Sequence, residues 1–451
     1  MAEVLGIRAA RVFTADGDNT VVANGTVEIA DGVVRRVRGP EEQDPGDVQV
    51  VDYGDATVLP GLVDAHCHVT LAGDRRTYEA MLLDGDELMA LVAVQQLRLH
   101  LESGVTTIRD NGGKDRIPFL VREGADRGYY LAPRMLLSGR PVTHSAGHFH
   151  WCNGVADSEV EIRAAVRRLV ADGADHIKIM ASGGGTGGNI PYLASFTVPE
   201  LRSAVEAAHE LERLTTAHAR AADSMTRAIE AGLDCIEHGE FLTRSPMTRY
   251  GSGIAASGQM TYDPKITEQL LESGTWLSYT MQAGGYETLL QLREQLAAGE
   301  PLSAEDSAMR DLLEEHFEMK AGIFERLLRD GAEDSMAISS DAGPFDTQFG
   351  HLDHGLRLAV DVGMAPASAL AAATIRAARV CGVADSVGSL EPGKLADVLV
   401  VNGDPLTDIG AVTDVADVWL DGRRVPRAGV RSLRLARAAL QPAPAVPGSS
   451  R

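Results

Sequence analysis

Two histidines, His66 and His68, stand two residues apart in the run DAHCHV. In a β-strand, residues i and i+2 point to the same face, so both imidazoles can bind one metal ion there. Cys67, between them, points to the other face and is expected in the core. The pair alone is a weak signal of a metal site and is more often two half-exposed histidines, so its meaning depends on the residues that can join it.

A lysine stands in the middle of a run that otherwise predicts a buried strand, Ile177-Lys178-Ile179-Met180. Burying an unpaired ammonium group costs on the order of several kcal/mol. Such a lysine must therefore reach solvent, lose its proton or be modified. Lys178 is the second unusual group of the chain, and it requires an explanation.

Three further polar side chains end apolar runs: His218 in TTAHAR, His238 in CIEHGE and Asp341 in AISSDAG. If parallel strands carry them, they meet at the edge formed by the carboxyl ends of those strands. A structural account must explain each of these groups separately, whereas a single metal site explains all of them. The sequence therefore predicts a metal centre built from residues that are far apart in the chain.

The middle of the chain alternates apolar runs with amphipathic helical patterns, which is typical of βα units. A helical pattern over residues 197–214 begins with Thr197, Pro199 and Glu200, which are suited to a capped first turn. The predicted strands are residues 62–69, 105–110, 134–142, 175–181, 214–219, 233–239, 276–281 and 334–343. Eight strands alternating with helices predict an α/β fold, a (β/α)8 TIM-type barrel.

Both ends of the chain consist instead of short β-branched runs separated by Asp-Gly and Asn-Gly turns. We expect residues 1–60 and 385–430 to pair into one small β-sandwich domain, and residues 61–384 to form the barrel. Residues 431–451 form a C-terminal extension, and its Pro-, Ala- and Ser-rich end is expected to be disordered.

The composition restricts the class of partner. The 451 residues carry a formal net charge of −22, which disfavours nucleic acid and anionic membranes as partners. No window approaches the roughly 18 apolar residues of a membrane span, and the first residues lack the pattern of a signal peptide. The four cysteines have no spacing typical of a zinc module or a disulfide framework. We expect a cytoplasmic enzyme.

The order of several motifs resembles that of the amidohydrolase superfamily. These motifs are VLPGLVDAHCH, IKIMASGG, AHA, IEHG, SDAG and the late run ATIRAARVCGV with GSLEPGKLADVLVV. The resemblance extends from about Val4 to Val425 and is strongest to the binuclear branch of metal-dependent prolidases and imidazolonepropionase-related hydrolases. That branch implies a barrel, a small β-sandwich built from both chain ends, and assembly as a homo-oligomer.

The resemblance also implies roles for the candidate ligands. It implies two divalent metal ions held by six residues: His66, His68 and Asp341 on one ion, His218 and His238 on the other, and Lys178 between them. The lysine would react with carbon dioxide to form a bridging carbamate, which requires a neutral amine whose pKa is lowered by burial. Zinc fits an imidazole-rich set best, with manganese or cobalt as alternatives.

The implied reaction is hydrolysis by a hydroxide that bridges the two metal ions, while one ion polarises the substrate carbonyl. Asp341 would accept the proton of the attacking water and pass it to the leaving amine. His148, in THSAGHFHW, resembles the residue that hydrogen-bonds the carbonyl oxygen; an ordinary loop histidine is the alternative.

Other residues are candidates for substrate binding from their position alone. They are His144, His150, Trp151, Arg109, Tyr192, Tyr279, Gln282 and Phe241. Phe241 stands where the prolidase pattern usually has a tyrosine, which puts a standard prolidase specificity in doubt.

Two loops are expected beside the site. The glycines at 183–188 formally match a dinucleotide motif, but no helix opens on them, so they predict a flexible loop. The long connection 241–263 is either a lid, with Tyr250 or Tyr262 entering the site, or a solvated insertion.

The sequence therefore predicts a hydrolase that cuts a C–N bond of a small molecule: an N-acyl amino acid, a dipeptide or a cyclic amide. Hydrolysis of a lactone, ester or phosphotriester at the same binuclear site is the alternative. A non-catalytic scaffold is disfavoured, because all six ligand positions are present.

Overall fold

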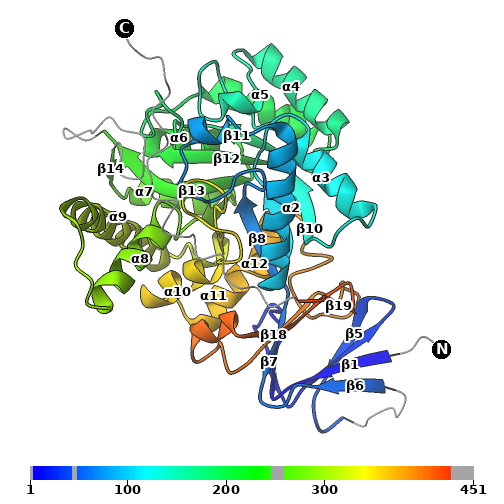
Figure 1. The fold of residues 1–451 in the computed structure, drawn as a ribbon. Coiled ribbons are helices and arrows are strands. Elements are labelled where there is room, and N and C mark those ends of the chain that lie inside the picture. Colours follow the sequence, from blue (N-terminus) through cyan, green and yellow to red (C-terminus); the bar gives the residue numbers. More distant parts are fainter. Residues whose placement is uncertain (1–3, 43–47, 245–257, 428–451) are drawn as a thin grey trace.

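The computed structural model describes residues 4–42, 48–244 and 258–427 (Figure 1). The predicted C-terminal extension, residues 431–451, lies outside these ranges. In the described part of the chain, strands and helices alternate, as an α/β fold requires. No helix there combines the length and the apolar content needed to cross a bilayer.

Eight parallel strands run through the middle of the chain. They are β8 (Leu62–Cys67), β9 (Val105–Asp110), β10 (Arg134–Leu137), β11 (His176–Met180), β12 (Leu214–Ala221), β13 (Cys235–Thr243), β15 (Trp276–Tyr279) and β16 (Met336–Ile338). Each predicted strand coincides with one of them. A short strand, β14 (Gln259–Met260), pairs antiparallel with β13.

The eight strands form two parallel series, β10-β9-β8 and β11-β12-β13-β15-β16. Single parallel bridges join the ends of the two series: Val142 to Ile179 after β10, and Cys67 to Ala342 after β16. The carboxyl ends of strands from both series therefore face a common space.

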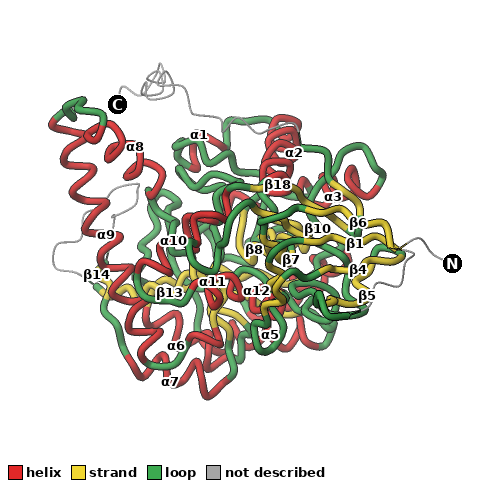
Figure 2. Tube along the Cα trace, turned by 90° about the horizontal axis from the view of Figure 1, so that it is seen from below, coloured by secondary structure: helices red, strands yellow, loops and turns green. Residues whose placement is uncertain are grey.

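Helices connect these strands and lie outside them (Figures 1 and 2). They are α1 (Tyr78–Met81), α2 (Asp86–Glu102), α3 (Ile117–Asp126), α4 (Glu159–Asp172), α5 (Val198–His209), α6 (Ala222–Ala231), α7 (Pro264–Ser273), α8 (Tyr286–Ala297), α9 (Ala304–Arg329), α10 (Asp353–Asp361), α11 (Pro366–Ala372) and α12 (Ile375–Val380), with 3-10 turns η1 (His150–Cys152), η2 (Glu333–Ser335) and η3 (Ile409–Thr413). Helices α8 and α9 pack on each other and project together at one side of the molecule in both views.

The chain ends contribute two further sheets, ordered β5-β4-β1-β6 and β19-β18-β17-β7-β2-β3. Their strands are β1 (Val4–Arg8), β2 (Arg11–Phe13), β3 (Val21–Ala23), β4 (Thr26–Ala30), β5 (Val33–Arg38), β6 (Val48–Asp52), β7 (Thr57–Pro60), β17 (Val398–Val401), β18 (Val415–Leu420) and β19 (Arg423–Arg424). Strand β7 pairs with both β2 and β17, so the two ends of the chain share one sheet (Figure 1). Ile7, Val27, Val58 and Val398 belong to one buried cluster there.

A direct connection ties this end region to the first strand that carries predicted ligands. Strand β7 leads into β8 through Gly61, where a Cβ atom would lie 2.2 Å from Thr106 Oγ1, so the chain needs glycine to pass. Arg134 of β10 also forms ion pairs with Asp397 and Asp421, each at 2.7 Å. The end region is therefore tied to the strands both at β8 and at β10.

Helix α5 begins as its sequence predicts. The Thr197 hydroxyl accepts a hydrogen bond from Glu200 N, and the Glu200 carboxylate accepts one from Thr197 N at 2.8 Å. This reciprocal pair satisfies two backbone donors that the first helical turn leaves free.

Replacing Thr197 by alanine should lower the free energy of unfolding by about 1 kcal/mol, because the cap is lost. The matched control is Thr226→Ala within α6, where the hydroxyl bonds the Ala222 carbonyl and caps nothing. Urea unfolding of both variants measures the difference, and equal midpoints would contradict the cap's contribution.

Candidate metal centre

Three predicted ligands meet at the carboxyl ends of β8 and β16. His66 Nε2 lies 3.3 Å from His68 Nε2 and 3.3 Å from Asp341 Oδ1. His68 Nε2 lies 3.5 Å from the same oxygen. These separations suit three donors around one ion, because the bond to a metal is about 2.0–2.2 Å long.

The other two histidines form a second pair beside this group. His218 Nδ1, on β12, lies 2.8 Å from His238 Nε2, on β13. The rings of His66 and His238 have centroids 4.9 Å apart, so the pair and the first group are neighbours. Lys178 projects from β11, the strand next to β12, and its fully buried Nζ has no hydrogen-bond partner in the described structure.

Acceptors around the imidazoles determine which ring nitrogen carries the proton. His68 Nδ1 donates to the Gly112 carbonyl at 2.9 Å, and His218 Nε2 donates to the Gly183 carbonyl at 3.1 Å. His66 Nδ1 lies 2.8 Å from Glu237 Oε2, a carboxylate that only accepts. In a neutral ring the other nitrogen then presents its lone pair, and in all three histidines that nitrogen faces the group of ligands.

Burial keeps these groups in the protonation state that metal binding needs. It lowers the pKa of His68, His218 and His238 well below 6.5, so the rings are neutral at pH 7. Burial also lowers the pKa of Lys178 to about 8, which makes its neutral amine accessible.

Two of the ligands occupy an unusual backbone conformation. His238 and Asp341 have φ values of 70° and 55°, in the left-handed region that non-glycine residues rarely adopt. The strain is of order 1–3 kcal/mol per residue, and the surroundings must hold it. Asp341 N donates to the His66 carbonyl at 2.8 Å, which fixes one ligand against the strand of another.

Asp64 supports the same junction. Its Oδ1 accepts hydrogen bonds from the backbone N–H groups of His66 and Ser340, at 3.2 and 3.0 Å. Its Oδ2 accepts from His100 Nε2 at 3.1 Å. One buried carboxylate therefore positions the strand of the first histidine pair and the segment that leads to Asp341.

Glu237 belongs to the centre although the sequence analysis did not select it. Besides His66, this fully buried carboxylate contacts Arg109 Nη2 at 2.8 Å and Asn111 Nδ2 at 3.0 Å. The available signal was the position of Glu237, a charged residue inside the apolar run CIEHG.

A cavity of about 150 Å³ opens over the metal centre. Its lining residues are Arg76, Thr77, Tyr78, His148, Gly185, His218, Arg220, His238, Glu240, Ala283, Gly284, His316, Asp341, Pro344, Phe345 and Thr347. The α8–α9 hairpin contributes to its wall, because His316 lies on α9 and Gly284 lies two residues before Tyr286, the first residue of α8.

His148 is the predicted non-ligand histidine that reaches this cavity. Its Nδ1 lies 2.8 Å from Thr186 Oγ1, and burial lowers the pKa of His148 to about 3. The ring packs on the glycine-rich loop after β11: a Cβ atom on Gly184 would lie 2.5 Å from His148 Nε2. The glycines therefore allow a close approach to a neutral histidine.

The eight predicted substrate-binding residues do not line the cavity. Arg109 is buried, with Nε donating to the Ala65 carbonyl and Nη1 to the Val380 carbonyl. The Tyr279 hydroxyl donates to the Lys320 carbonyl, and Gln282 Oε1 accepts from Gly355 N. Position near a strand end did not reveal that these side chains point into the protein.

The remaining candidates are also absent from the lining of the cavity. Phe241 is fully buried and packs on Tyr262, with centroids 5.0 Å apart. Trp151 packs behind the cavity on Phe149, and His150 Nδ1 bonds the Gly147 carbonyl. His144 contacts the Phe196 ring. Tyr192, which is half-buried, is likewise absent from the lining.

Most of the predicted lid, including Tyr250, falls in residues 245–257, outside the described residues. Tyr262 is described, and its hydroxyl donates to Asp330 Oδ2 at 2.6 Å. It does not enter the cavity over the metal centre.

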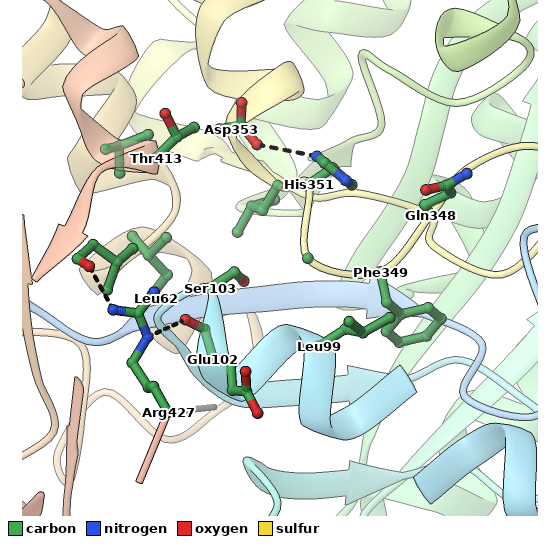
Figure 3. A pocket seen from close by; sticks show the side chains of 14 residues that line it. Leu62, Leu99, Glu102, Ser103, Gln348, Phe349, His351, Asp353, Thr413 and Arg427 are labelled. Atoms are coloured by element: carbon green, nitrogen blue, oxygen red, sulfur yellow. Dashed lines mark hydrogen bonds and ion pairs between the residues drawn. The ribbon is translucent and has the colours of Figure 1, made fainter. Parts of the chain in front are cut away.

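A second cavity, of about 220 Å³, lies at the other end of β8 (Figure 3). Leu62, the first residue of β8, lines it together with Glu102, His351 and Arg427. Arg427 Nε donates to the Glu102 carbonyl at 3.0 Å, so the end of α2 and the chain's last described residue are in contact beside this space. Nearby, Glu287, His351 and His354 also lie within metal-binding distance of one another, but none of them lines the first cavity.

Comparison with known proteins places these observations in context. The model of the amidohydrolase family matches residues 57–425. Ochratoxinase from Aspergillus niger is 27% identical over 411 residues, covering 83% of this chain and 76% of that protein. Imidazolonepropionase from Deinococcus deserti is 25% identical over 436 residues, covering 88% and 91%. A solved Xaa-Pro dipeptidase with bound methionine has a TM-score of 0.76 and 25% identity, covering 94% of this chain and all of that one.

The metal-free protein should lose stability as the pH falls below about 6.5. Because burial lowers the pKa of His68, His218 and His238 and brings that of His316 to about 3, the folded state binds fewer protons than the unfolded chain in this range. In this range the free energy of unfolding therefore decreases as the pH decreases. It keeps its full value above the pKa that the histidines have in the unfolded chain.

Guanidinium unfolding of the metal-free protein at pH 7.5 and 5.5 measures this loss. His316→Asn removes one buried imidazole that is not a candidate ligand. It should reduce the pH dependence by at most about 1.4 kcal/mol per pH unit. An unchanged dependence would contradict the assignment of His316 as a buried neutral base.

Proposed function

Since this chain belongs to the amidohydrolase family, we propose that it is a metal-dependent hydrolase that cleaves the C–N bond of a small-molecule amide. The observation that supports this most is the meeting of four histidines, Asp341 and Lys178 below one small cavity. The names of similar proteins, a dipeptidase among them, agree with amide substrates. An N-acyl amino acid, a dipeptide or a cyclic amide fits this proposal.

We further propose that the eight parallel strands form a closed (β/α)8 barrel over residues 61–384. The two single bridges that join the ends of the strand series support closure. Residues 1–60 and 385–430 form a β-sandwich in this proposal, supported by the sheet that β7 shares with β2 and β17. Ligands at the carboxyl ends of the strands are then at the usual place for a barrel's site.

The donor set fits two divalent ions, most simply zinc. His66, His68 and Asp341 would hold one, and His218 and His238 the other. Lys178 would hold both as a carbamate. The unpartnered, buried Nζ supports this role, because an amine without a partner is costly there and an anion between two cations is not.

When bound, the two ions would acidify a water molecule and polarise the substrate carbonyl. The residues of the chain then move the proton and hold the substrate. Asp341, whose pKa is raised by burial, accepts the proton of the water and delivers it to the leaving amine. His148, neutral and held by Thr186, donates a hydrogen bond to the carbonyl oxygen as negative charge develops.

We propose a cytoplasmic homo-oligomer without nucleic-acid or membrane partners. The net charge of −22 supports the last point, because phosphate and anionic lipid surfaces would repel the chain.

Lys178→Ala should reduce the metal content measured by mass spectrometry after dialysis against zinc, from about two ions per chain to one or fewer, because the bridging ligand is gone. The matched control is Lys320→Met. Lys320 is equally buried and its pKa is also lowered to about 8, but its Nζ donates to the Thr280 and Ala283 carbonyls. This control should keep both ions, and equal loss in the two variants would refute the bridging role.

The function is tested by a turnover screen of zinc-loaded protein. N-acyl amino acids, dipeptides and cyclic amides are compared with lactones, esters and phosphotriesters, and His66→Ala is the inactive control. Hydrolysis confined to the amides supports the proposal, and hydrolysis confined to the other classes overturns it. On the amide that is turned over, His148→Asn should lower kcat about 10²–10³-fold at unchanged metal content.

A further inference from the structure

The strands that carry the second histidine pair continue with a pair of opposite charges. Arg220 follows His218 by two residues on β12, and Glu240 follows His238 by two residues on β13. The two strands are neighbours, and all four side chains line the cavity over the metal centre. The charged pair therefore forms the next layer of the wall above the ligands.

Arg220 is held by only one of its nitrogens. Its Nε donates to Glu240 Oε2 at 2.6 Å, and the structure shows no other hydrogen bond from the guanidinium to the described residues. The side chain is 19% exposed, and the exposed part faces the cavity that it lines. The two Nη atoms are thus available to a molecule in the cavity.

Glu240 does not cancel the positive charge of this layer. The carboxylate is 5% exposed, and Lys320 Nζ lies 3.7 Å from its other oxygen. Lys320 in turn donates to the carbonyls of Thr280 and Ala283, at 2.7 and 2.9 Å. The Glu240 carboxylate is shared by Arg220 and Lys320, so these three groups together keep one positive charge at neutral pH. The two buried groups, Glu240 and Lys320, hold the Arg220 guanidinium in place.

The second arginine of the cavity wall is already satisfied. Arg76 Nε donates to Asp74 at 2.8 Å, and its Nη1 and Nη2 contact the two oxygens of Asp84 at 3.0 and 2.9 Å. Two carboxylates neutralise it and occupy its donors. Among the described residues that line the cavity, Arg220 is therefore the cation whose hydrogen-bond donors are not all used by the protein.

We propose that Arg220 binds a carboxylate of the substrate, held in place by Glu240 and Lys320. This inference rests on the proposed function and narrows it: the substrate is an amide with a carboxylate close to the scissile bond, such as an N-acyl amino acid or a dipeptide. The planar guanidinium matches the two oxygens of a carboxylate, which binds by two parallel hydrogen bonds. Neutral cyclic amides and phosphotriesters leave this charge without a partner.

The test compares N-acetyl-L-methionine, N-acetyl-L-phenylalanine and N-acetyl-L-proline with their carboxamides on zinc-loaded protein. The acids should have kcat/KM values at least about tenfold above those of the carboxamides, since a charged hydrogen bond is lost in the latter. Arg220→Gln should lower kcat/KM for the acids about 10–100-fold more than for the carboxamides, and Arg220→Lys should recover part of that difference. Arg76→Gln, which removes the same charge from the same wall, should leave the ratio unchanged.

A wild-type enzyme that turns over acid and carboxamide equally would overturn the carboxylate site while the amidohydrolase activity stands. Equal losses on both substrates in Arg220→Gln would also overturn it. If neither substrate is turned over, calorimetric titration of the same pairs decides. Tighter binding of the acid, lost in Arg220→Gln but kept in Arg76→Gln, supports the site without the activity, and equal binding refutes it.

Discussion

The unpaired amine of Lys178 is the constraint on which the centre depends. A fully buried ammonium with no acceptor cannot persist at neutral pH without cost, and burial, partly offset by the charges of Glu237 and Asp341, lowers the pKa of this lysine to about 8. No hydrogen bond to this amine is present in the described structure, and the imidazoles of His68, His218 and His238 have pKa values lowered well below 6.5 by burial. In the function proposed above, a carbamate on Lys178 between two divalent cations would remove this cost.

The rest of the structure keeps that set in position. Backbone carbonyls and Glu237 orient the imidazoles from outside, and Asp64 ties the strand of His66 to the segment before Asp341. The strained Asp341 donates its backbone N–H to the His66 carbonyl, and Nδ1 of the strained His238 lies 2.9 Å from Thr280 Oγ1. Because most of these contacts join different strands or the segments that follow them, the centre forms only when the parallel strands have come together.

The sequence predicted which polar residues meet at the strand ends much better than which residues line the cavity, for a physical reason. A polar residue that ends an apolar run, such as His218, is unusual in itself, and the convergence of parallel strand ends brings such residues together whatever the details of packing. A residue such as Arg109 has the same kind of position, but its direction depends on partners that the sequence does not show, here the Ala65 carbonyl and Glu237. The eight strands were predictable because each is a compact apolar run. The sequence also predicted that the two chain ends pair, but not which strands meet, such as β7 and β17.

Position 241, where the chain departs from the prolidase pattern, does not contribute to the wall of the cavity. Phe241 places an apolar ring where that pattern has a phenol, and the ring is buried against Tyr262 instead of facing the cavity. A tyrosine hydroxyl at position 241 could not bind a substrate in this cavity, because the side chain at that position does not line the cavity. Arg220 and Glu240 do reach it, on the same strands as two of the ligands. If a substrate carboxylate binds Arg220 as proposed, its distance from His218 and His238 is set by the strand backbone, because these residues share β12 and β13.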